Sequence, residues 1–264
     1  MPLIPGTGSL PVSCQRAVLS LLPIKGDLAL LKNWRPVALL TVDYKVLSRA
    51  LLNRLKGILE IVIHQDQTYC IPDRTFMDNI FIVRDVMDVC RAHEVNVGVV
   101  SLDQEKAFDR VDHSYLFFAL RAYGIREGFL SWVGLLYNGA QCLVKMGAGL
   151  CKPIPVQRGI RQGCPISGQL YSLATEPLLC RLRSQLSGLS LPASCGLERL
   201  PTLSAYADDV RIFVSSQRDV KRLQDTLSLY ERASSARANW AKSSALLLGH
   251  WREQVVPRLP GGFQ

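Results

Sequence analysis

The feature that most constrains this chain is a pair of adjacent carboxylates set between two short apolar runs. Leu203–Tyr206 and Val210–Val214 flank Ala207, Asp208 and Asp209. Two such runs around a turn predict a β-hairpin. Adjacent acids repel each other and gain nothing from packing. They therefore lie either in a solvated turn, where Asp is common, or in a turn that holds both carboxylates rigidly near one point.

A third acid closes another apolar run. Val95–Leu102 is rich in valine and is followed by Asp103. A strand that is apolar on both faces is expected at the centre of a sheet, so a carboxylate at its end lies at the surface of the core. If this strand neighbours the hairpin, Asp103 meets Asp208. Mg²⁺ takes only one or two carboxylates, and two such ions stabilise the attacking and leaving oxygens in phosphoryl transfer.

The remaining pattern predicts an α+β domain. Helical periodicity recurs near residues 42–58, 80–90, 116–123, 129–136, 170–182 and 220–230, with a kink expected at Pro177. Further strands are expected at 141–146, 152–157 and 244–248. Because helices and strands do not alternate strictly, a layered α+β arrangement is favoured. In the first helix, one apolar face is expected to hold Val42, Val46, Ala50, Leu51, Leu55 and Ile58.

Composition excludes several classes of protein. The 264 residues are 48% hydrophobic and 20% charged, which favours a folded domain over disorder. The net charge of +9 favours a polyanionic partner, although a basic protein can also lack one. No apolar run reaches the roughly 18 residues of a membrane span. The eight cysteines form no C-x-x-C pair, which argues for reduced thiols rather than a zinc ribbon or a disulfide scaffold.

Several blocks resemble the reverse transcriptases of non-LTR (LINE-type) retrotransposons. Residues 206–209 are similar to the family's Y-x-D-D signature, and residues 103–111 to its D-x-x-x-A-F-D-x-V block. Residues 158–167 resemble R-G-x-R-Q-G-x-P-x-S, and residues 33–40 resemble N-W-R-P-x-x-L-L. Residues 74–79 and 234–243 resemble two further blocks, with Asp73 and Ser235 where glycine is usual.

This resemblance implies a right-hand polymerase fold with an antiparallel palm sheet and helical fingers. The fingers and palm are expected over residues 19–251, after a disordered start at 1–18 and before a truncated tail at 252–264, with the thumb missing. The implied partners are an RNA template, a DNA primer and dNTPs, without a membrane. Nuclear location is expected from the family, and the oligomeric state is not assigned.

The resemblance also implies residue roles. Asp103, Asp208 and Asp209 would hold Mg²⁺, with Mn²⁺ as an alternative. Lys242 would be the general acid toward pyrophosphate, or else a solvated lysine. Arg35 would bind the triphosphate, and Lys25 would substitute for a family lysine because Ile24 occupies its place. Phe108 would select dNTPs by its ring, or else be a core residue, and Gln162 and Gly163 would contact the nucleotide. Template or primer contacts are expected at Arg74, Asn79, Arg158, Arg161 and Tyr206, although Arg74 and Asn79 would serve equally as surface caps.

The implied function is RNA-directed DNA polymerisation by two-metal transfer of a dNTP to a primer 3′-hydroxyl. One alternative is a catalytically inactive remnant that binds nucleic acid, which the departures at Ile24, Asp73 and Ser235 favour. Another is a metal nuclease. The blocks around Arg35 and Gln162 argue against a nuclease, because it needs no dNTP pocket.

Overall fold

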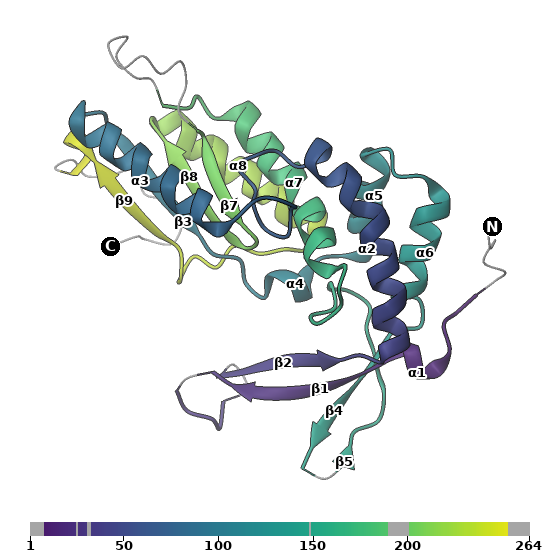
Figure 1. Cartoon of the computed structure of the whole chain (residues 1–264). Helices are drawn as coiled ribbons and strands as arrows, with labels where there is room; N and C mark the ends of the chain where they lie inside the picture. Colours follow the sequence, from purple (N-terminus) through teal and green to yellow (C-terminus); the bar gives the residue numbers. More distant parts are fainter. Residues whose placement is uncertain (1–7, 25, 31–32, 148, 190–200, 253–264) are drawn as a thin grey trace.

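A computed structural model describes residues 8–24, 26–30, 33–147, 149–189 and 201–252 and contains two β-sheets (Figure 1). A four-stranded sheet has the order β7-β8-β3-β9, formed by Leu203–Tyr206, Asp209–Val214, Val97–Leu102 and Ser244–Leu248. A five-stranded sheet has the path β2-β1-β4-β5, with β6 also on β4; its strands are Trp34–Leu39, Arg16–Pro23, Gln141–Met146, Gly149–Leu150 and Ile154–Pro155. The expected α+β class is confirmed.

The four-stranded sheet is antiparallel throughout and contains the expected hairpin. β7 pairs with β8 so that Tyr206 lies opposite Asp209. β3 pairs with β8 so that Leu102 lies opposite Val210. Since antiparallel partners run in opposite directions, one further step of this register brings Asp103 alongside the hairpin turn. The predicted neighbourhood of the acids therefore follows from the backbone pairing.

Helices cover both faces of this sheet, as the continuous valines of β3 predict. Val100 packs in one cluster with residues of α7 (Ser167–Gln185) and α8 (Gln217–Ser234). Val99 packs in another with Val86 and Cys90 of α3 (Phe76–Ala92). Successive strand residues thus face opposite helical layers. α7 continues through Pro177, where a kink was expected.

The remaining described helices precede α7 in the chain, apart from one 3₁₀ helix. They are α1 (Val12–Gln15), α2 (Val42–Val62), α4 (Ala107–Arg110), α5 (His113–Ala122) and α6 (Glu127–Tyr137), and the 3₁₀ helix η3 (Gly249–Arg252) follows β9. The central part of α7 is buried on every side, which makes it the axis of the largest core. None of the described helices is both long and apolar enough to cross a bilayer.

Three features differ from the sequence analysis. The segment expected to be disordered contains α1 and the start of β1, so residues 12–18 are structured. The strands β1 and β2 were not expected, and β1 pairs antiparallel with β2 and parallel with β4. In α2 the predicted apolar face is wrong at its start, where Val42 is 74% exposed and Val46 is 64% exposed. Tyr44 is buried instead and rotates the inward face toward Ser48, Leu51, Leu55 and Leu59.

Candidate active site

A cleft of about 840 Å³ brings together residues from most of the sequence blocks. The five-stranded sheet contributes Arg35, the residue after β3 is Asp103, and α4 contributes Phe108. The loop before α7 contributes Gln162 and Gly163. The hairpin turn and the segment before β9 contribute Asp208 and Lys242. Residues that are more than two hundred positions apart in the sequence, such as Arg35 and Lys242, therefore meet in one cavity.

The acids influence one another electrostatically. Burial raises the pKa of Asp103, and Asp209 raises it further, whereas Lys242 opposes the shift. Burial also raises the pKa of Asp208, with added repulsion from Asp209 and Asp103 and an opposing effect of Arg35. Asp209 itself lines a neighbouring groove with Tyr206. Two carboxylates therefore face the cleft and the third lies close enough to repel both.

The donor set suits a hard divalent cation. Asp103 and Asp208 offer carboxylate oxygens to the same space, and Mg²⁺ needs only one or two carboxylates besides water and phosphate oxygens. In the described parts of the chain, no three His, Cys, Asp or Glu side chains are grouped as a metal site.

The segment before β9 wraps around Asp103. The Asn239 amide N–H donates to the Asp103 carbonyl at 2.8 Å, and its side chain donates to the Asp103 carboxylate at 3.4 Å. The Asp103 amide donates to the Ser243 hydroxyl at 3.1 Å. These bonds fix the chain that carries Lys242. The role of Asn239 was missed, although it stands at a defining position of its sequence block.

The nucleotide-binding predictions cluster as expected, with one exception. The Gln162 side chain donates to the Asp109 carboxylate at 3.3 Å, and both line the cleft. Gly163 adopts φ +90°, and a Cβ there would lie 2.8 Å from the carbonyl oxygen of Ala38 in β2. The glycine is therefore required by the close approach of the two backbones. Lys25 lies outside the described residues.

Phe108 lines the cleft within an aromatic group that the sequence analysis missed. Its ring stacks on Tyr171 of α7, and Tyr69 meets it edge-on. Tyr69 also meets Tyr206 edge-on, with ring centroids 5.1 Å apart. The sequence does not indicate that Tyr171 supports Phe108, because a tyrosine among the apolar residues of a helix cannot be distinguished from an ordinary core residue.

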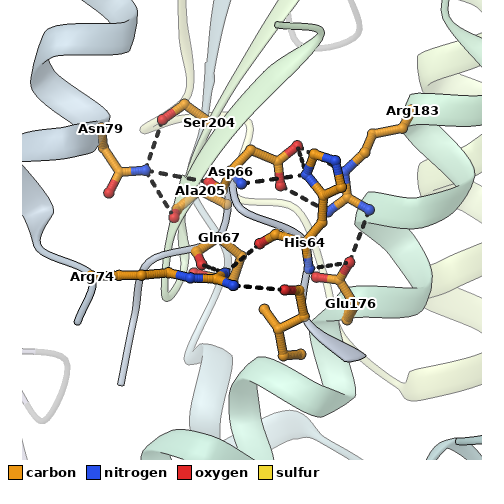
Figure 2. Close-up of polar contacts among 10 residues, drawn as sticks. His64, Asp66, Gln67, Arg74, Asn79, Glu176, Arg183, Ser204 and Ala205 are labelled. Carbon is orange, nitrogen blue, oxygen red and sulfur yellow. Dashed lines mark hydrogen bonds and ion pairs between the residues drawn. The ribbon is translucent and has the colours of Figure 1, made fainter. Parts of the chain in front are cut away.

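The predicted template contacts separate into two groups. Arg158 is exposed and Tyr206 is 37% exposed, so both remain available. Arg161 is buried, donates to the Gln15 carbonyl at 2.7 Å and lies over the Tyr44 ring. Arg74 and Asn79 are bonded to protein groups (Figure 2). Asn79 and Arg161 therefore point inward and Arg74 is half-buried, whereas their contact with template stays a prediction.

The glycine replacements occupy strained backbone. Asp73 has φ +56° and Ser235 has φ +62°. The left-handed region favours glycine, and Asp tolerates it better than most residues. The positive φ of Asp73 gives a physical reason why glycine is usual at this position.

Comparison with known proteins identifies the family. Residues 24–256 match the family described as reverse transcriptase (RNA-dependent DNA polymerase). The chain is 51% identical over 250 residues to the transposon TX1 uncharacterized 149 kDa protein of Xenopus laevis. It is 28% identical over 253 residues to a Pol polyprotein from the type-1 retrotransposable element R2 of Popillia japonica. Each alignment covers 95% of this chain, but only 19% and 35% of those longer proteins.

Solved structures show the same fold. A telomerase from Candida tropicalis, in complex with a fragment of telomeric RNA, aligns with a TM-score of 0.63 at 13% identity, over 91% of this chain and 42% of the telomerase chain. The apo telomerase truncated from its C-terminal domain aligns with a TM-score of 0.60 over 92% and 52%. The expected right-hand polymerase fold is therefore confirmed. By its sequence blocks, its cleft and these matches, the chain belongs to the reverse transcriptase family and resembles the part of non-LTR retrotransposon polyproteins that carries this domain.

Proposed function

We propose that the cleft adds a dNTP to the 3′-hydroxyl of a DNA primer, directed by an RNA template. The observation that supports this most is the meeting of Asp103, Asp208 and Lys242 with Arg35 and Phe108 in one cavity. Acids, a permanent cation and an aromatic wall are the groups that dNTP transfer needs. A nuclease would use the acids but not the other two.

Each side chain has a role that follows from its place. Arg35 would bind triphosphate oxygens with its planar, permanently charged guanidinium. Lys242, beside Asp103, would donate a proton to the departing pyrophosphate. Asp103 and Asp208, with Asp209, would hold the divalent cations. When bound, these cations would lower the pKa of the primer hydroxyl and neutralise the triphosphate charge.

Primer extension tests this proposal. Extension of oligo(dT) on poly(rA) is measured with Mg²⁺ and with Mn²⁺ for the parent chain, Asp208→Asn and Asp225→Asn. Asp225 is exposed on α8 and supplies a matched loss of one carboxylate. We expect Asp208→Asn to lower extension by at least about 100-fold and Asp225→Asn to leave it unchanged. Binding of the duplex without extension by the parent chain would instead support the inactive remnant.

A further inference from the structure

We propose that Asn79 and Arg74 are positioning residues that hold the outer edge of β7 and thereby fix the turn that carries Asp208. The proposal gives these residues an internal role in place of a template contact. It rests on the proposed function only in taking Asp208 as catalytic. The turn itself is demanding, because Ala207 adopts φ +55° directly before Asp208, and such backbone persists only where its surroundings hold it.

The outer edge of β7 is covered by a short segment, residues 66–68. β7 is the first strand in the sheet order, so the backbone groups on its free side need other partners. The Ala205 amide donates to the Asp66 carbonyl at 2.8 Å. The Thr68 amide donates to the Ala205 carbonyl at 3.1 Å. Gln67 therefore forms a parallel bridge with Ala205, three residues before Asp208.

The Asn79 side chain joins this segment to β7. Its amide nitrogen donates to the Ala205 carbonyl at 3.0 Å and to the Ser204 hydroxyl at 2.8 Å (Figure 2). Its amide oxygen accepts a hydrogen bond from the Thr68 hydroxyl. The side chain is buried, and both ends of its amide have protein partners. One residue of α3 thus fastens two chain segments together.

Arg74 holds the start of the same segment. Its guanidinium donates to the carbonyls of Ile63 at 3.0 Å, His64 at 2.6 Å and Gln67 at 2.8 Å (Figure 2). Ile63 is the C-cap of α2, so Arg74 supplies partners for carbonyls that a helix end leaves free. The chain is thereby turned from the end of α2 toward the edge of β7.

A buried ion pair anchors the segment on its other side. Arg183 of α7 donates to both oxygens of the Asp66 carboxylate, at 2.7 and 2.8 Å, and forms an ion pair with Glu176 at 2.8 Å (Figure 2). Bidentate pairs of this kind fix geometry as well as charge. Segment 66–68 is therefore held by Arg74, by Asn79 of α3 and by Arg183 of α7, and through its bonds to Ala205 it transmits that rigidity to the hairpin.

Hydrogen exchange of the full chain tests the proposal without needing polymerase activity. Exchange by mass spectrometry is compared for the parent chain, Asn79→Ala and the control Asn53→Ala, an exposed helix asparagine. We expect amides in peptides covering 203–210 to exchange about tenfold faster in Asn79→Ala, while peptides covering α5 and α6 stay unchanged. Thr68→Val, which loses only the bond to the amide oxygen, should give a smaller effect in the same peptides.

Three results would overturn the proposal. The first is unchanged exchange at 203–210 together with weaker binding of poly(rA)/oligo(dT) by Asn79→Ala, which would restore the template contact. The second is faster exchange across the whole chain, which would show a general loss of stability. The third is unchanged exchange in both Asn79→Ala and Thr68→Val. None of these three results requires primer extension. The primer-extension assay therefore tests the proposed function independently of this proposal.

Discussion

The ring of Phe108 lies nearly parallel to the ring of Tyr171, with centroids 4.1 Å apart and planes at 16°. Tyr171 is fully buried in α7, the axis of the largest core. The ring of Tyr69 also meets Phe108 edge-on, with centroids 6.2 Å apart. The wall of the cleft is therefore fixed by the core and is not a mobile surface ring.

This wall predicts selection against ribonucleotides. We expect Phe108→Ala to lower the preference for dTTP over UTP about 10- to 100-fold, because removing the ring leaves room for a 2′-hydroxyl. The ratio of kcat/KM for the two nucleotides on poly(rA)/oligo(dT) measures this. Phe118→Ala, at a side chain that is 70% exposed on α5, is the control. An unchanged ratio in Phe108→Ala would show that the ring has only a packing role.

The contact between Gly163 and Ala38 predicts a stability difference. Gly163→Ala places a methyl group 2.8 Å from a backbone oxygen at φ +90°, so we expect a loss of about 1–3 kcal/mol in the free energy of unfolding. Gly128→Ala is the control, because it lies in α6 with nothing within 4 Å of the added Cβ. That change should stabilise the chain by about 0.5–1 kcal/mol. Urea unfolding measures both, and equal effects would contradict the close approach.

Asp73 and Ser235 adopt left-handed backbone at positions where glycine is usual, so we expect glycine to be more stable than either residue there. Ser235 caps the C-terminal end of α8 with φ +62°, so Ser235→Gly should raise the free energy of unfolding by about 0.5–1 kcal/mol. Asp73→Gly should gain less, because Asp tolerates this conformation better than Ser. Thermal and urea unfolding test the order of the two gains. A loss in Ser235→Gly would show that the serine side chain has a stabilising contact.

The sequence predicted the part of the site that local pattern determines. The hairpin at 203–214 and the strand that ends at Asp103 follow from short apolar runs, and their pairing brings the acids together. The inward role of Asn79 was not predictable in this way. Its partners lie 125 and 126 residues away on β7, and local pattern does not distinguish a buried amide from a template contact.

In the five-stranded sheet, β4 and β6 were expected but β1 and β2 were missed, for a related reason. β1 pairs in parallel with β4, more than a hundred residues later, so neither strand has a hairpin partner on that side. The buried face predicted for α2 was wrong at the start of the helix. Val42 and Val46 fit a helical repeat as well as Tyr44 and Ser48 do. In the structure Tyr44 and Ser48 face the core, so tertiary packing overrode the simple count of apolar positions.

The surroundings of Asp219 predict that part of the free energy of unfolding depends on pH in the acid range. Its carboxylate is fully buried and accepts hydrogen bonds from the Ser187 amide at 2.9 Å, the Ser215 amide at 3.3 Å and the Ser215 hydroxyl at 3.1 Å. Burial alone would raise the pKa of Asp219, but these donors outweigh it and hold the pKa below its ordinary value. The folded state therefore prefers the ionised form. The Asp219 carboxylate therefore stabilises the fold above the pKa that it has in the unfolded chain, about 3.9. This stabilisation is lost as the pH falls through the lower pKa that it has in the folded chain.

We therefore expect Asp219→Asn to lower the free energy of unfolding by about 1–3 kcal/mol at pH 7, since an amide presents N–H groups to N–H donors. The deficit relative to the parent chain should shrink as the pH falls below about 4. Urea unfolding at pH 7, 5, 4 and 3 measures this difference. Asp225→Asn, on the exposed side of the same helix, should stay within about 0.5 kcal/mol throughout. The loss of unfolding free energy in Asp219→Asn could instead be equally large at pH 3 and pH 7. That result would mean that the steric fit of the Asp219 side chain, and not its charge, stabilises the contact between the end of α7 and the start of α8.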